Sequence, residues 1–303
     1  MRIRTVLSDL LPAAFGVCDS HDHLFFRSAV LPGQELDDEA AALAEVRAFA
    51  DAGGQAIVQW TPHGLGRRAE LLPGISKSTG VSLVAATGLH RREHYPDGFV
   101  EKIKDQLAEI FVRELTVGIG NSQVRAGLIK VAGGFHVLDA HAELVMRAAA
   151  EAHHATGAAI AVHHEVGSAA DAVLDLLVDK LDVHPLAVIL GHLNRFPDQR
   201  MHLELARRGA YLAFDGPSRA NSATDPQLMD SLAALVEAGY GERLLIGGDT
   251  TTARARAATG EGPGMPYLLT HIKPRITRQL GADAADAIFR SNPARAFATD
   301  WRA

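Results

Sequence analysis

The sequence has 303 residues but only one cysteine, Cys18, so it lacks the pair that an internal disulfide bond requires. It also lacks any run of eighteen or more apolar residues, the length that predicts a membrane-spanning helix. The first residues, Met1 to Arg4, do not form the long apolar stretch of a secretory signal peptide. These absences argue against a disulfide-stabilised secreted protein and against a membrane protein, and we expect a cytoplasmic one.

No charge of one sign dominates, because 30 Lys and Arg residues stand against 36 Asp and Glu residues, a formal net charge of −6. Proteins that bind nucleic acid or acidic membranes carry a basic surface, so we expect neither partner. There is also no low-complexity segment and no Pro/Gly/Ser linker, so we predict a single domain over residues 1–303. The unusual excess is histidine, with fifteen residues, and histidine is the commonest metal ligand.

Short apolar runs alternate with longer amphipathic stretches eight times along the chain. The runs are rich in Val, Ile, Leu and Ala on both faces, as is typical of parallel strands covered by helices. They cover residues 15–18, 55–60, 82–86, 126–131, 158–162, 186–190, 210–214 and 243–246.

The stretches between these runs carry helix boundaries. Asp37 and Asp38 can begin one helix and Gly53 can end it, while Asp139 and Gly157 bound another. Eight such strand–helix units predict an α/β fold, a (β/α)8 TIM barrel. A doubly wound open sheet is the alternative, but no Gly-x-Gly-x-x-Gly or Walker loop follows any of the expected strands.

Polar residues that can bind metals stand at the carboxyl ends of five of the expected strands, where the active sites of such barrels lie. They are His21 and His23 after the first, Lys130 at the end of the fourth, His163 and His164 after the fifth, His192 after the sixth, and Asp249 after the eighth. Scattered histidines would rarely coincide so regularly with strand ends. We therefore predict a metal site at this end of the barrel.

The His21-x-His23 spacing suits a shared ion, because residues i and i+2 of a strand point to the same face and Asp22 points away. An ordinary polar pair at a strand end is the alternative. Asp249 can bind a metal and also act as the general base for an activated water. A helix N-cap is the alternative for Asp249, because three threonines follow it.

Lys130 ends an apolar strand, where a bare ammonium group would be costly to bury. A neutral lysine amine can react with carbon dioxide, and the resulting carbamate can bridge two cations as a carboxylate does. A structural lysine or a Schiff-base lysine is the alternative. Histidine and carboxylate ligands suit zinc, our first choice, and also manganese, cobalt or iron. Two such ions can lower the pKa of a bridging water to about 7 and polarise a carbonyl group.

Several separate motifs, in order along nearly the whole chain, resemble the phosphotriesterase-like family of the amidohydrolase superfamily. They include His21-Asp22-His23, where the family usually has His-Glu-His, then Gly127-Leu128-Ile129-Lys130, His163 with Glu165, Gly191-His192, Gly247-Gly248-Asp249, residues 262–269 and Asn292-Pro293-Ala294-Arg295. The family usually has a threonine where His164 stands.

The resemblance implies a binuclear metal centre. His21, His23 and Asp249 would hold the more buried ion, His163 and His192 the more exposed one, and carboxylated Lys130 with a hydroxide would bridge them. The implied activity is hydrolysis of a small ester, with a lactone as the first choice, through attack of the metal-bridging hydroxide. A homodimer is also compatible with the resemblance.

Three residues are expected to contact the substrate: His90 in the loop after the third strand, His164 beside His163, and Arg219 in the loop after the seventh strand, where it can meet an anion. Three alternative functions stay open: a phosphotriesterase with the same metals, a non-catalytic metal-binding barrel, and a Schiff-base aldolase that uses Lys130.

Overall fold

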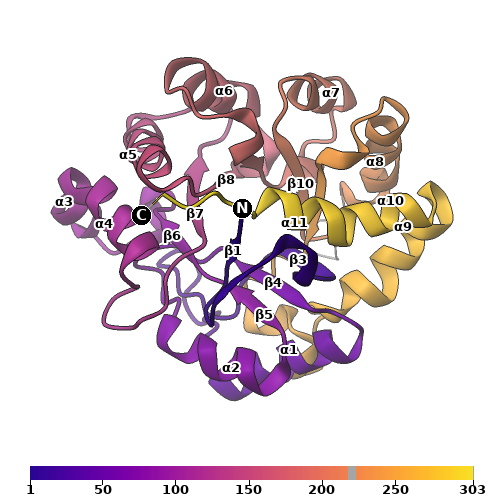
Figure 1. Ribbon diagram of the computed structural model, residues 1–303, viewed down its shortest axis with the longest axis horizontal. Helices are drawn as coiled ribbons and strands as arrows, with labels where there is room; N and C mark the ends of the chain where they lie inside the picture. Colours follow the sequence, from indigo (N-terminus) through magenta and orange to yellow (C-terminus); the bar gives the residue numbers. More distant parts are fainter. Residues whose placement is uncertain (218–222, 303) are drawn as a thin grey trace.

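The computed structural model describes residues 1–217 and 223–302, with parallel strands at the centre and helices around them (Figure 1). A short antiparallel hairpin comes first, made of β1 (Ile3–Arg4) and β2 (Asp9–Leu10). The central strands are β3 (Cys18–Asp22), β4 (Ala56–Gln59), β5 (Ser82–Val84), β6 (Ala86–Gly88), β7 (Leu128–Gly133), β8 (Ile160–His164), β9 (Val188–Leu190), β10 (Tyr211–Asp215) and β11 (Leu244–Gly247).

The central strands are joined in chain order by parallel ladders, in one sheet from β3 to β5 and another from β6 to β11. Only Ala85 separates β5 from β6, so these two segments share the third strand position. Just beyond β11, the backbone N–H of Asp249 donates to the carbonyl of His21 in β3 at 2.9 Å, so the last strand lies against the first. The eight parallel positions confirm the predicted α/β, TIM-barrel-like fold.

Five predicted strands were wrong by two or more residues at a boundary. The fourth and fifth lie two residues later than predicted, over Leu128–Gly133 and Ile160–His164. The first strand is not residues 15–18 but begins at Cys18 and continues through polar residues to Asp22, because the barrel end buries these side chains completely. The third is interrupted at Ala85 and reaches Gly88. The sixth begins at Val188 and not at 186, because Pro185 starts a 3-10 turn and cannot donate to a ladder.

The helices follow the strands around the outside of the barrel (Figure 1). They are α1 (Glu39–Asp51), α2 (Leu72–Thr79), α3 (Phe99–Ile103), α4 (Leu107–Thr116), α5 (Ala140–Thr156), α6 (Ala170–Leu174), α7 (Gln199–Arg207), α8 (Leu228–Glu237), α9 (Lys273–Leu280), α10 (Ala282–Asp286) and α11 (Asn292–Ala296). Asp38 and Asp139 cap α1 and α5 by accepting from the N–H groups of Ala41 and Ala142 at 3.0 and 2.8 Å, as predicted.

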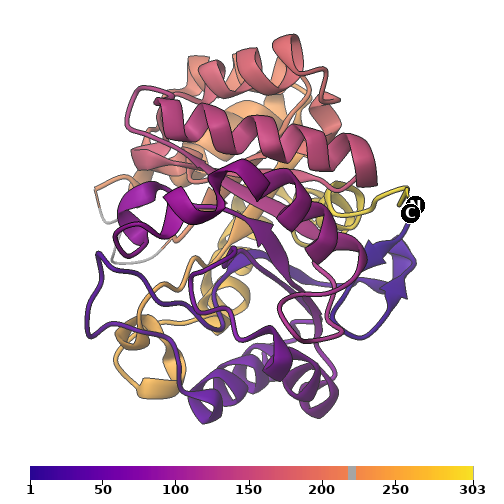
Figure 2. The same ribbon diagram turned by 90° about the vertical axis from the view of Figure 1, so that its left-hand side faces the viewer.

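The core has two layers. One lies between the strands and the helices, and the other fills the barrel interior with buried side chains such as Val58, Leu128 and Leu245. The interior packing leaves the carboxyl ends of the strands as the place where polar side chains gather. At the opposite end the termini lie together (Figure 2), and the N–H of Arg2 donates to the carbonyl of Thr299 at 2.7 Å. In the described part of the chain, no helix is long and apolar enough to cross a membrane.

Candidate metal centre

All six residues predicted to bind metals line a single small cavity of about 120 Å³ at the carboxyl ends of the strands. The residues are His21, His23, Lys130, His163, His192 and Asp249. Five of them lie within two residues of the carboxyl end of β3, β8, β9 or β11, and Lys130 is the third of the six residues of β7. Apart from His163 and Asp249, which are slightly accessible, they are almost completely buried. The fold therefore brings residues up to 228 positions apart into one polar pocket.

His21, His23 and Asp249 form the tightest group. Oδ1 of Asp249 lies 3.4 Å from Nε2 of His21 and 3.5 Å from Nε2 of His23. Two ligands held about 2.1 Å from one ion at angles of 90–110° are about 3.0–3.4 Å apart. The two distances to Asp249 are close to this separation, and all three donor atoms lie within 4.8 Å of one another, so the group could hold one divalent cation.

The hydrogen bonds of His23 leave the correct nitrogen free for a metal. The Thr61 hydroxyl donates its one proton to the carbonyl of Phe25 at 2.7 Å, so it must accept from Nδ1 of His23, 2.8 Å away. With the proton on Nδ1, Nε2 keeps its lone pair and faces Asp249. Such a partner on the far nitrogen fixes the tautomer and orientation of a ligating imidazole.

The ring of His21 is held on two sides. Trp60 stacks on it with the ring centroids 3.7 Å apart, so this tryptophan packs against a predicted ligand. Asp215, at the end of β10, places Oδ2 3.0 Å from Nδ1 of His21 and also accepts the backbone N–H of His192 at 3.0 Å. Sequence reasoning missed Asp215, although an acidic residue directly after the apolar run 210–214 was a usable signal.

Burial sets the protonation of the pocket. It lowers the pKa of His23 to about 4 and that of His163 to about 3, so both rings are neutral at pH 7 and have lone pairs to offer. Burial also lowers the pKa of Lys130 to about 7, against the opposing effect of the Asp249 charge. For Asp249, burial favours the protonated form, but His192 and Arg195 outweigh it and hold its pKa well below the usual value.

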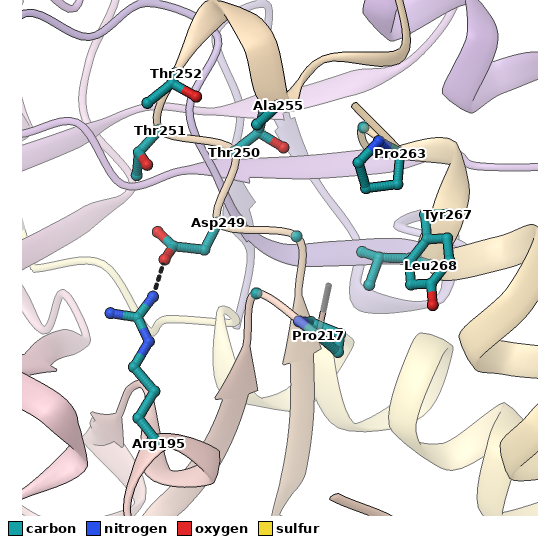
Figure 3. A pocket seen from close by; sticks show the side chains of 13 residues that line it. Arg195, Pro217, Asp249, Thr250, Thr251, Thr252, Ala255, Pro263, Tyr267 and Leu268 are labelled. Atoms are coloured by element: carbon teal, nitrogen blue, oxygen red, sulfur yellow. Dashed lines mark hydrogen bonds and ion pairs between the residues drawn. The ribbon is translucent and has the colours of Figure 1, made fainter. Parts of the chain in front are cut away.

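Two ion pairs at the border of the pocket were not identified from the sequence. Arg195, at the end of the 3-10 turn Leu193–Arg195 that follows β9, donates to Oδ2 of Asp249 (Figure 3). Arg91 donates to Glu165, whose Oε2 lies 3.2 Å from Nε2 of His163. Neither ion pair could be predicted, because the partners of the first are 54 residues apart in the sequence and those of the second are 74 residues apart.

The three predicted substrate contacts have different positions. His90 is buried in the pocket wall, with its ring centroid 4.7 Å from that of His163 and 4.0 Å from that of His94. The structure does not bring His164 to the pocket: it is buried on the other face of β8, where Nδ1 donates to the carbonyl of Gly191 at 3.1 Å. This follows from the alternation of side chains along a strand. Arg219 lies outside the described residues.

A larger cavity of about 320 Å³ lies on the other side of Asp249 and Arg195 (Figure 3). It is bounded by Pro217 and by the long connection between β11 and α9. The side chains of that connection which line it are Thr250, Thr251, Thr252, Ala255, Pro263, Tyr267 and Leu268. Arg195, Asp249 and Thr251 line both cavities, so the two spaces meet at these residues.

Comparison with known proteins agrees with this geometry. The model of the Phosphotriesterase family matches residues 1–297. A phospho-furanose lactonase of Mycoplasmopsis synoviae is 26% identical to this chain, over 98% of this chain and 92% of its own. The solved structure of the lactonase Lmo2620 from Listeria monocytogenes superimposes with a TM-score of 0.91 at 27% identity, covering 99% of this chain and 100% of the other.

The organophosphorus hydrolase from Deinococcus radiodurans is similar as well, with a TM-score of 0.87 at 26% identity, over 98% of this chain and 97% of the other. Among the described residues two groups that share His21 could hold a metal ion, as expected for a family that depends on a binuclear metal centre: His21 with His23 and Asp249, and His21 with His192 and Asp215. The family match over almost the full length, together with the order of the strand-end residues, shows that this chain belongs to the phosphotriesterase family.

Proposed function

We propose that the protein is a metal-dependent hydrolase of small esters and that lactones are its substrates. The observation that carries this proposal is the convergence of His21, His23 and Asp249, with their metal-compatible spacing, in a pocket that also contains Lys130. The similarity to a phospho-furanose lactonase and to a lactonase supports the choice of a lactone.

Two divalent cations, with zinc as our first choice, are proposed as cofactors. His21, His23 and Asp249 would hold one ion, His163 and His192 the other, and a carbamate formed from Lys130 and carbon dioxide would bridge them. The pKa of Lys130 near 7 leaves much of its amine neutral at that pH, which is the form that reacts with carbon dioxide. When bound, the ions would supply an acidified water and polarise the substrate carbonyl.

The protein residues then have distinct tasks. Asp249, ionised and at the junction of the two cavities, would accept the proton of the attacking water and pass it to the leaving alkoxide. His90, beside His163, would contact the substrate near its carbonyl group. The larger cavity next to Asp249 would hold the remainder of the substrate.

The carboxyl end of the last strand bears on whether the substrate carries a phosphate. The three residues after Asp249 are neutral threonines, and Arg195, which lines both cavities, is paired with Asp249. We therefore propose a lactone whose substituent is neutral. Arg219, a predicted anion contact, lies outside the described residues, so a panel with and without phosphate must decide. A single catalytic domain over 1–303 and a homodimer stay predictions.

The deciding experiment measures metal content per chain and hydrolysis on the same sample. Lactones with and without phosphate, an aryl dialkyl phosphate and a simple carboxylic ester form the panel. Two metals per chain with chelator-sensitive lactone cleavage would support the proposal. Faster cleavage of the phosphate triester would favour a phosphotriesterase, for which the similarity to the organophosphorus hydrolase speaks. Metal without any hydrolysis would favour a non-catalytic barrel.

Lys130 is tested separately. Reconstitution of metal-free protein with zinc should recover more activity when bicarbonate is present, and Lys130→Met should abolish this effect. If borohydride and a carbonyl substrate instead trap a covalent adduct on Lys130, the residue forms a Schiff base and the carbamate proposal is wrong.

A further inference from the structure

The connection between β11 and α9 forms much of the wall of the larger cavity, and its first part, residues 248–265, contains little regular structure. Two short 3-10 turns, Ala253–Ala255 and Ala257–Thr259, are its only helical elements before residue 260. Its five internal backbone hydrogen bonds join residues no more than nine positions apart, so they close turns within residues 250–265 but do not attach the segment to the barrel. Something outside the connection must therefore hold it.

Glu45 provides such a contact, in addition to the bonds of Thr250 to Asp22 and of Arg256 to Leu24. It belongs to α1, is completely buried, and accepts from three backbone N–H groups of the connection. Oε1 accepts from Met265 at 2.9 Å and from Ala257 at 3.3 Å, and Oε2 accepts from Ala258 at 2.8 Å. A carboxylate is costly to bury unless its oxygens are bonded, and charged acceptors form strong bonds to N–H groups. The three bonds thus satisfy the carboxylate and fix the connection at two places.

Two further features show that the β11–α9 connection packs closely against Glu45 and the residues around it. Gly264 has a φ of +58°, and a Cβ at this position would overlap both Oε1 of Glu45 and the nitrogen of Ala257. Arg256 is also buried and donates to the carbonyl of Leu24, the residue after His23. Burial lowers the pKa of Arg256, and the negative charge of Glu45 offsets this effect.

We infer that Glu45 is a positioning residue for substrate specificity: its carboxylate holds the β11–α9 connection in the shape that forms one wall of the cavity beside Asp249. Glu45 does not line either cavity, so it acts through the backbone of residues 257–265. The inference rests on the proposed function in one respect only, namely that this cavity holds the part of the substrate away from the reacting carbonyl.

Different substitutions of Glu45 should loosen the β11–α9 connection to different degrees. Glu45→Gln keeps one acceptor oxygen but turns an NH2 group toward an N–H that has lost its partner, whereas Glu45→Ala removes all three bonds. Gly264→Ala should mimic the loss from the other side by displacing the carboxylate. Glu39→Gln, on the exposed first turn of the same helix, is the matched control.

Hydrogen exchange followed by mass spectrometry tests the inference without any substrate. We expect the amides of residues 257–265 to exchange about tenfold faster in Glu45→Gln, and faster still in Glu45→Ala, because each lost bond leaves a backbone group unprotected. The control variant should exchange as the wild type does. Unchanged exchange in both Glu45 variants would overturn the inference.

Kinetics on the same variants test the effect on specificity. For lactones with a substituent that reaches the larger cavity, KM should rise about tenfold in Glu45→Gln with kcat within about threefold, whereas lactones without a substituent should be unaffected. Metal content should not change. Loss of metal together with kcat would show that Glu45 acts on the metal centre instead, and would overturn the inference.

If the wild-type protein cleaves no lactone, the proposed function fails, while the exchange experiment still decides the role of Glu45. If Glu45→Ala does not fold, Glu45→Gln and Gly264→Ala carry the same test.

Discussion

Asp249 lies where the predicted metal ligands and the larger cavity meet, and it carries both of its proposed tasks on one carboxylate. Its Oδ1 faces His21 and His23, and its Oδ2 accepts from Arg195. Asp215 faces the far side of the His21 ring, and Glu165, beside His163, is paired with Arg91, so Asp249 is the carboxylate at the junction of the two cavities.

Asp249→Asn should preserve the shape of the side chain but remove its charge and basicity. We expect kcat for lactone hydrolysis to fall about 10²–10⁴-fold, the range of a lost general base, and metal affinity to fall with it. The check is turnover and metal content on one sample, with circular dichroism to show that the fold persists. Asp230→Asn on the exposed face of α8 is the control. Normal turnover in Asp249→Asn would remove it from the mechanism.

Asp215 has a different expected signature. Its carboxylate contacts Nδ1 of His21 and the backbone N–H of His192. We therefore expect it to orient these two predicted ligands without itself binding the ion held by His21, His23 and Asp249. In Asp215→Asn we expect metal affinity to fall about 10–100-fold, the usual effect of losing the partner of a ligating histidine. Competition with a chromogenic chelator measures this directly. Turnover at saturating metal should recover most of the wild-type value; failure to recover would point to a direct catalytic role.

At the scale of elements, a second buried polar cluster joins the third strand to its helix. Glu114 of α4 accepts from Thr87 of β6 and from Arg67, and its Oε1 lies 2.9 Å from Nδ1 of His63. Arg67 also donates to the carbonyl of Ala86 at 2.8 Å. The cluster therefore attaches α4 and the loop after β4 to the strand position that is interrupted at Ala85.

Burial alone would raise the pKa of Glu114, but the hydrogen bond from His63 and the charge of Arg67 outweigh it and hold the pKa at about 2. A carboxyl group with a lowered native pKa stabilises the fold above its unfolded pKa of about 4.3, and this contribution is lost as the pH falls toward 2. Glu114→Gln should therefore lower the free energy of unfolding by about 3 kcal/mol at pH 7.

Urea unfolding at several pH values measures this prediction. The difference between wild type and Glu114→Gln should be largest above pH 5 and should shrink steadily between pH 4.3 and 2. Glu109→Gln, near the start of the same helix, is the control and should show no such trend. A difference that is the same at every pH would mean that packing, and not the charge of Glu114, accounts for the loss.

The elements also show why some features could be predicted and others could not. His21 and His23 were found because a strand repeats every two residues, and Asp38 and Asp139 because helix starts favour acidic caps. The first strand was placed too early because its last residues are polar, and only the closed end of the barrel makes burial of Asp19 and Asp22 favourable. Local pattern does not contain that information.

Contacts between residues far apart in the sequence could not be predicted for the same reason. Glu45 is one acidic residue in a helix that has several, and nothing in its neighbourhood marks it as the partner of residues more than 210 positions away. Arg195 and Asp215 likewise gain their roles only when β9, β10 and β11 lie side by side. The positions of the predicted ligands followed from strand order alone, whereas their partners required the packed structure.

On the scale of the whole molecule, the predicted ligands come from both sheets, with His21 on the sheet of β3 to β5 and Lys130 and His163 on the sheet of β6 to β11. Bound ions would therefore link the two halves of the barrel. A ligand that binds only the native state stabilises it by about 3 kcal/mol when present at a hundred times its dissociation constant.

Removal of metal should thus lower the melting temperature by about 5 °C, and zinc should restore it. Differential scanning calorimetry with and without chelator measures the shift, and His163→Ala should show a smaller one. If the chelator leaves the transition unchanged in protein that had contained two metals per chain, the ions do not link the sheets.

The backbone at this end of the barrel has one more property. Seven described residues other than glycine have a positive φ, and six of them follow the carboxyl ends of strands, His192 and Asp249 among them with φ of 62° and 48°. Each such residue is held in a conformation that costs about 1–3 kcal/mol. The protein should therefore be easy to make more heat-resistant by placing glycine at these positions, and at His192 and Asp249 that gain would come with the loss of a predicted ligand. Selection for thermal stability alone would therefore be expected to give a more stable barrel that has lost predicted metal ligands.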